Sequence, residues 1–87
     1  MSYSIEFRPS AKKALRELPR SDGPRILKAI ETLSENPYGP GRKKLKGTDF
    51  WRIRVGDYRV VYTVVQSMLL VVVIKIGHRR EVYRELV

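Results

Sequence analysis

The chain has 87 residues, with 18 Lys and Arg against 9 Asp and Glu, a formal net charge of +9, and no cysteine. The length allows one small domain, expected over residues 1–87, and excludes an enzyme with a separate cofactor domain. The lack of cysteine excludes disulfide scaffolds, zinc fingers and thiol nucleophiles, and it is typical of a reducing compartment.

The hydrophobic segments are short. The N-terminal residues contain no long apolar segment of the kind found in signal peptides. The longest apolar run, residues 68–74, has seven residues, far fewer than a membrane span needs. We therefore expect a cytoplasmic protein without membrane partners.

Positive charge is concentrated in the middle of the chain. Residues 37–60 hold seven basic and two acidic side chains. A surplus of this kind favours a polyanionic partner, because it attracts phosphate groups.

The first part of the sequence predicts one strand followed by two helices. Residues 3–8 alternate apolar and polar side chains, the period of a half-buried strand. Ser10 is a predicted N-cap for a helix that ends before Pro19. Capping residues and a proline at 21–24 predict a second helix, which closes at Asn36. Two helices joined by a short turn form an αα-hairpin.

The second part predicts a loop and three strands. The loop covers residues 37–49, and the strands cover 50–55, 58–65 and 69–77, where Val, Ile, Tyr and Trp dominate. Gly56-Asp57 suits a type II′ hairpin turn, and residues 66–68 join the other two strands. The fold class is therefore α+β: a small antiparallel sheet, made of the N-terminal strand and a three-stranded meander, with the αα-hairpin packed on one face. The tail at 79–87 is either a short helix or an extended segment.

The length of the hairpin turn sets the register of the first two meander strands. A two-residue turn places Arg54 directly opposite Arg59, and Arg52 shares their face. Like charges opposite one another destabilise a sheet. Conflicts of this kind tend to mark functional surfaces.

The third meander strand is placed by its apolar pattern. Its expected core-face residues are Leu70, Val72, Ile74 and Ile76. A three-residue turn then pairs Val60 with Ile74 and Arg59 with Lys75. Four cations would lie on the face that the helices leave open, with His78 and Arg79 at its rim.

These cations indicate phosphate chemistry. The acidic residues are dispersed and the only imidazole is His78, so we expect no metal and no cofactor. Guanidinium groups match phosphate oxygens, and several of them aimed at one phosphodiester would stabilise the charge of its transition state. RNA carries its own nucleophile, the 2′-hydroxyl, so metal-free RNA cleavage fits these residues.

Three blocks of the sequence resemble the RelE/ParE toxin superfamily, and its RelE branch in particular. They are residues 44–47 (KLKG), 51–62 (WRIRVGDYRVVY) and 75–83 (KIGHRREVY). The resemblance implies a toxin of a toxin–antitoxin pair that cuts messenger RNA in the ribosomal A site without a metal. It also implies a small cognate antitoxin that wraps the toxin in a hetero-oligomer.

The resemblance also implies a set of site residues. The catalytic residues that it implies are Arg52, Arg54, Arg59, Arg79 and Tyr83, and His78 is added to them on chemical grounds. The expected RNA-binding residues are Lys43, Lys44, Lys46 and Lys75, which carry positive charge that can follow backbone phosphates. The best-known RelE enzymes have lysines in place of Arg52 and Arg54, and arginine keeps its proton. His78 is therefore the expected proton-transfer group, and Tyr83 is expected to orient a base.

Two other functions stay open at this point. One is a ParE-like toxin that inhibits DNA gyrase and is not a nuclease, because that branch shares the fold. The other is an RNA-binding module with weak catalysis. The convergent cations and the pair of His78 and Tyr83 favour the nuclease, since gyrase binding does not require them.

Overall fold

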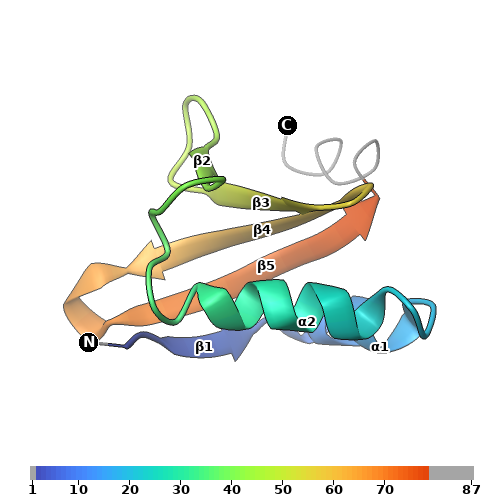
Figure 1. The fold of residues 1–87 in the computed structure, drawn as a ribbon. Coiled ribbons are helices and arrows are strands. Elements are labelled where there is room, and N and C mark those ends of the chain that lie inside the picture. The colour runs from blue at the N-terminus through green and yellow to red at the C-terminus, as the bar shows by residue number, and fades with distance from the viewer. Residues whose placement is uncertain (1, 79–87) are drawn as a thin grey trace.

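The computed structural model describes residues 2–78 (Figure 1). In chain order the elements are β1 (Ser4–Phe7), α1 (Pro9–Glu17), α2 (Gly23–Thr32), β2 (Lys43–Lys44), β3 (Trp51–Val55), β4 (Tyr58–Val65), a 3₁₀ turn (Gln66–Met68) and β5 (Leu70–His78). The strand order in the sheet is β1-β5-β4-β3-β2. None of the helices within this part of the chain is long and apolar enough to span a membrane.

The predicted α+β class with an αα-hairpin on one sheet face is confirmed, with a difference in strand direction. β1 runs parallel to β5, whereas the other strand pairs are antiparallel. The sheet is therefore mixed and not antiparallel throughout, because β1 joins the far end of the meander after a crossover. The expected loop also contains β2, in which Lys43 pairs with Arg52.

The start of α1 differs from the sequence prediction, whereas α2 starts within the predicted residues 21–24. α1 begins at Pro9, and its N-cap is Arg8 in an extended conformation, so the prediction of Ser10 as the cap is wrong. Proline suits a first helical position, since the N–H that it lacks would have no helical partner there. Asp22 is the N-cap of α2 but makes no capping bond. Its carboxylate instead accepts a hydrogen bond from Tyr58 Oη at 3.1 Å.

The β3–β4 hairpin has the predicted register. Val55 pairs with Tyr58 and Arg54 pairs with Arg59. Gly56 has a φ of +60°, whereas Asp57 is not in the left-handed region, as a type II′ turn requires.

The predicted β4–β5 register is wrong by one residue next to the turn. Beyond the bulge it is wrong by two residues. Leu69 adopts a left-handed conformation (φ 47°) and belongs to the turn, so Val65 pairs with Leu70. A β-bulge at Ile74 then adds one residue to β5. Tyr62 pairs with Val73, but its neighbour Val61 pairs with Lys75, so Ile74 has no partner on β4.

The two shifts change which β5 residues enter the core. Val71 and Val73 are fully buried there, and the predicted core residues Leu70 and Val72 lie on the opposite face. After the bulge the pattern returns, and Ile76 is a core residue as predicted.

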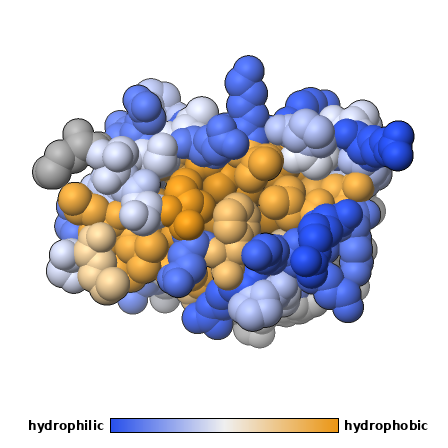
Figure 2. Space-filling view, turned by 90° about the horizontal axis from the view of Figure 1, so that it is seen from below, coloured by the Kyte–Doolittle hydropathy of each residue, from blue (hydrophilic) through white to orange (hydrophobic). Residues whose placement is uncertain are grey.

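The core lies between the αα-hairpin and one face of the sheet. Its buried residues are Ala11, Ile26, Ile30, Leu33, Ile53, Val60, Tyr62, Val71, Val73 and Ile76. Ile5 and Phe7 of β1 pack against this cluster from the sheet edge. Seen from the β1 side, apolar side chains form a band between polar margins (Figure 2). The helices therefore cover one sheet face, the one that carries the core residues.

Candidate nucleic-acid interface

The strand registers place five cations on the sheet face opposite the helices. They are Lys43 of β2, Arg52 and Arg54 of β3, Arg59 of β4 and Lys75 of β5. We name this surface the basic face. Residues that pair across strands, or that lie two apart on one strand, share a face, which is why side chains from four strands gather here.

Two pairs of like charges lie directly opposite each other on the basic face. Lys43 pairs with Arg52, and Arg54 pairs with Arg59. Within residues 2–78, none of Lys43, Arg52 and Arg54 forms an ion pair with a carboxylate. The fold therefore holds these cations together without neutralising them, a destabilising arrangement that an anionic ligand would relieve.

Arg59 is less accessible than the sequence predicted. Arg54 is exposed and Arg52 is half-buried, but only 6% of Arg59 is exposed. Its Nε is buried and has no hydrogen-bond partner in the described part of the chain. The expectation of a fully open arginine face is therefore wrong at this position.

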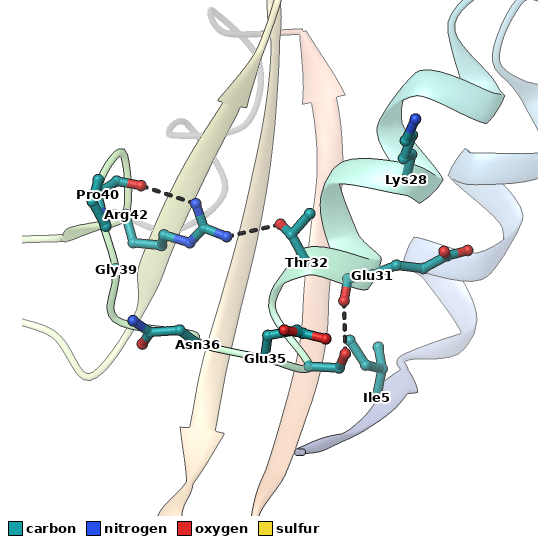
Figure 3. A pocket seen from close by; sticks show the side chains of 10 residues that line it. Ile5, Lys28, Glu31, Thr32, Glu35, Asn36, Gly39, Pro40 and Arg42 are labelled. Carbon is teal, nitrogen blue, oxygen red and sulfur yellow. Dashed lines mark hydrogen bonds between the residues drawn. The ribbon is translucent and has the colours of Figure 1, made fainter. Parts of the chain in front are cut away.

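An open pocket of about 450 Å³ lies at the β2–β3 edge of the basic face. It is lined by Gly41, Arg42, Lys43, Arg52 and Arg54. The guanidinium of Arg42 donates to the Pro40 carbonyl at 2.9 Å and to Thr32 Oγ1 at 2.8 Å (Figure 3). These acceptors hold the Arg42 side chain in place but are neutral, so Arg42 keeps its charge and adds to the positive charge that Lys43, Arg52 and Arg54 give this pocket.

His78 lies at the end of β5 and does not join the arginines. It pairs with Tyr58, on the sheet face that the helices cover. The two rings pack edge to face, with centroids 6.2 Å apart. The hydrogen bond to Asp22 raises the pKa of Tyr58. The residue opposite Arg59 is Gly77, so His78 is next to the basic face along the chain but is directed to the other side.

The remaining predicted lysines lie around the β2–β3 loop. Lys44 pairs with Trp51, on the face opposite that of Lys43. Lys44 and Lys46 line a second open pocket of about 430 Å³, formed by residues 44–49. The loop is closed by a hydrogen bond from Leu45 N to Phe50 O at 2.8 Å. Lys43 and Lys44 are thus split between the two faces of one edge strand.

The sequence prediction missed the strand that positions Lys43. The turn-forming residues at 47–49 between two strand-like segments are a hairpin signal that could have indicated it. Arg79 and Tyr83, two further predicted catalytic residues, lie outside the described residues. Among residues 2–78, no three His, Asp or Glu side chains lie close enough together to hold a metal ion.

Comparisons with known proteins identify the family to which this fold belongs. A family model described as the ParE toxin of the type II toxin–antitoxin system, parDE, matches residues 5–83. The putative toxin RelE1 of Methanocaldococcus jannaschii is 33% identical over 88 residues, covering 97% of this chain and 98% of that protein. The mRNA interferase toxin RelE of Escherichia coli is 31% identical over 91 residues, covering 100% of this chain and 96% of that protein.

Solved structures of similar proteins have the same fold. The isolated RelE toxin of Escherichia coli has a TM-score of 0.80 at 31% identity, covering 98% of this chain and 95% of that chain. RelE in the archaeal RelE–RelB complex from Pyrococcus horikoshii also has a TM-score of 0.80 at 31% identity, covering 93% and 99%.

The family match spans most of the chain, so this protein belongs to the ParE toxin family of type II toxin–antitoxin systems, within the RelE/ParE superfamily. Its relatives at 31 to 33% identity are named RelE. It is therefore a RelE-like toxin, and the resemblance found in the sequence is confirmed.

Proposed function

We propose that this toxin is an endoribonuclease that cleaves messenger RNA in the ribosomal A site. The observation that carries the proposal is the basic face, where four strands gather five cations. A relative of nearly the same length is named an mRNA interferase toxin, which supports RNA as the substrate.

The chemistry of the proposal needs only groups that RNA and this chain provide. The RNA 2′-hydroxyl gives its proton to a base and attacks the adjacent phosphorus, and negative charge develops on the phosphate oxygens. The bond from phosphorus to the 5′-oxygen of the next nucleotide breaks, and that oxygen takes up a proton, which leaves a 2′,3′-cyclic phosphate and a free 5′-hydroxyl. Arg54 and Arg59 face one another and would stabilise that charge, because guanidinium groups donate in a fixed fork to phosphate. Arg59 would act most strongly, since a buried donor interacts with charge in a lower dielectric.

The other roles follow from the resemblance. Arg52 would assist at the phosphate, Arg79 would hold it together with Arg59, and Tyr83 would orient a base. His78 is the proposed proton-transfer group, because an imidazole ring can both accept and donate a proton. His78 pairs with Tyr58 on the face opposite the basic face. For this role its ring would have to reach the reacting phosphate around the end of β5.

We further propose that a cognate antitoxin binds this toxin in a hetero-oligomer. The Pyrococcus horikoshii relative was solved as a RelE–RelB complex, and RelE of Escherichia coli was solved as an intact RelBE toxin–antitoxin complex. A chain of net charge +9 suits an acidic partner, because opposite fields steer association.

Mapping the 5′ ends of messenger RNA after induction, with and without translation blocked, tests the proposed activity. We expect new 5′ ends within translated messages, and we expect them to disappear when translation is blocked. Arg59→Ala and Arg54→Ala should each reduce cleavage by about 10²-fold, the effect of removing one donor to a developing oxyanion.

Two controls make the cleavage test decisive. Arg54 is exposed, so Arg54→Ala should lose cleavage without losing the fold, whereas Arg59→Ala removes a buried side chain. Circular dichroism shows whether each variant is folded. Arg20→Ala, in the exposed turn between the helices, should cleave normally. Intact messages together with a DNA-damage response would instead support gyrase inhibition, the activity of the ParE branch. Intact messages with ribosome binding would support an RNA-binding module.

A further inference from the structure

We infer that the basic face binds two consecutive phosphates of one RNA strand, each at its own pair of cations. The inference rests on the proposed function, because it takes RNA as the ligand. The outer pair is Lys43 with Arg52, from β2 and β3. The inner pair is Arg54 with Arg59, from β3 and β4.

The spacing of the two pairs follows from strand geometry. Arg52 and Arg54 lie two residues apart on one face of β3, which separates them by about 7 Å. Consecutive phosphates of an extended single strand have a similar spacing. Within each pair the backbones are about 4.8 Å apart, so both side chains can reach the same phosphate.

The pocket at the edge of the sheet extends from the outer pair to Arg54, the exposed member of the inner pair. Its lining includes Lys43 and Arg52 from the outer pair and Arg54 from the inner pair. Arg42 also lines it, but its guanidinium is bound to Thr32 and Pro40. A strand that enters at Lys43 therefore meets the outer pair first and the inner pair next.

The two pairs differ in burial, which gives them different tasks. Arg59 of the inner pair is 6% exposed, and its Nε has no partner among the described residues. Lys43 of the outer pair is exposed, on an edge strand of two residues. The inner pair therefore suits the reacting phosphate, where desolvated charge is most effective. The outer pair suits the neighbouring phosphate, so Arg52 would assist the reaction by setting the position of the RNA and not by contacting the reacting phosphate.

Short RNA ligands that cannot be cleaved test this register. Fully 2′-O-methylated oligonucleotides with one, two or three phosphates would be titrated into the full-length toxin and followed by NMR. In the wild type we expect the second phosphate to raise affinity about tenfold, as one added charge-assisted contact does, and the third to add much less. The log–log salt slope for the two-phosphate ligand should be about −1.4.

Variants of the outer pair should remove only the gain in affinity that the second phosphate gives. In Arg52→Ala the gain from the second phosphate should disappear, and the salt slope should fall to about −0.7. Lys43→Ala, at an exposed edge, should reduce the same gain and serves as a second variant if Arg52→Ala folds poorly. Arg20→Ala should keep both the gain and the slope.

Several results would overturn the inference: equal gains from the second and third phosphates, a full second gain in both outer-pair variants, or no binding of any ligand. The readout is separate from cleavage. If messages are cut in cells but the second phosphate adds nothing, the inference fails and the proposed function stands. If the two steps appear while messages stay intact, the proposed function fails and the two-phosphate register stands.

Discussion

Tyr62 connects the sheet to the segment that leads into β2. Its side chain is fully buried in the core, and its hydroxyl donates a hydrogen bond to the Pro37 carbonyl at 2.5 Å. Burial raises the pKa of the Tyr62 phenol well above its usual range. Tyr62 therefore stabilises the fold with its proton in place, and it anchors the chain just before the residues that line the edge pocket.

Replacing Tyr62 tests this anchor. Tyr62→Phe should lower the free energy of unfolding by about 1–2 kcal/mol at neutral pH, because the buried Pro37 carbonyl loses its donor. The folded pKa is raised, so the contribution of Tyr62 is complete below about pH 10, the ordinary tyrosine pKa, and is lost as pH rises further. The gap between wild type and variant should therefore narrow above pH 10. Urea unfolding at several pH values measures it.

Tyr3, a half-buried tyrosine whose hydroxyl bond is exposed, provides the control for this change. Tyr3 Oη donates to Gln66 Oε1 at 3.0 Å, and the same oxygen also accepts from Tyr38 Oη at 2.8 Å. Tyr3→Phe should change stability by less than about 0.5 kcal/mol, because the acceptor keeps a donor and the site is exposed to water. An equal loss in both variants would contradict the role given to burial at Tyr62.

At the scale of elements, the β3–β4 hairpin sets the inner pair of arginines. Its two-residue turn requires a positive φ at Gly56, observed at +60°, and this fixes which residues oppose one another. Arg54 faces Arg59 as a direct consequence. The turn is thus the local feature on which the inner pair depends.

Gly56→Ala should destabilise this hairpin by about 1–2 kcal/mol, the cost of a left-handed conformation for an L-residue. The added Cβ would also lie 2.7 Å from Arg25 Nη2, although that exposed side-chain end can move away. Gly23→Ala is the matched control. Its Cβ would approach Leu15 O no closer than 3.8 Å, and its φ is ordinary, so we expect a gain of about 0.4–1 kcal/mol. Thermal unfolding measures the stability of both variants. A loss of stability of the same size in both would contradict the role given to the positive φ of Gly56.

At the scale of the whole molecule, the sheet brings together charges that are distant in the sequence. Lys43 and Lys75 are the first and last of the five basic-face cations in the sequence, and four strands place these cations on one surface. The chain has a net charge of +9, and such self-repulsion opposes the compact state. The cations of the basic face should therefore favour RNA binding but lower the stability of the fold.

Arg54→Thr tests this opposition. Removing the charge that faces Arg59 should raise the free energy of unfolding by about 0.5 kcal/mol, because it relieves a like-charge pair in the sheet. The gain should shrink at high salt, which screens the repulsion, while growth arrest is lost. Denaturant unfolding at low and high salt, with a growth assay, gives both readouts. A variant that is less stable at every salt concentration would contradict the repulsion.

The sequence determined the features that depend on neighbouring residues. Apolar periodicity placed both helices and the meander strands, and a two-residue turn fixed Arg52, Arg54 and Arg59 on one face, because local backbone geometry sets the register of a hairpin. The resemblance to RelE toxins was likewise contained in short blocks of residues.

The tertiary structure decided what depends on residues that are far apart. The parallel pairing of β1, the edge strand β2, the turn at Leu69 and the bulge at Ile74 all follow from how the sheet closes over the helices. These features placed Lys43 opposite Arg52 and His78 opposite Tyr58. A bulge or a crossover is selected by packing across the whole core, and no local pattern specifies it.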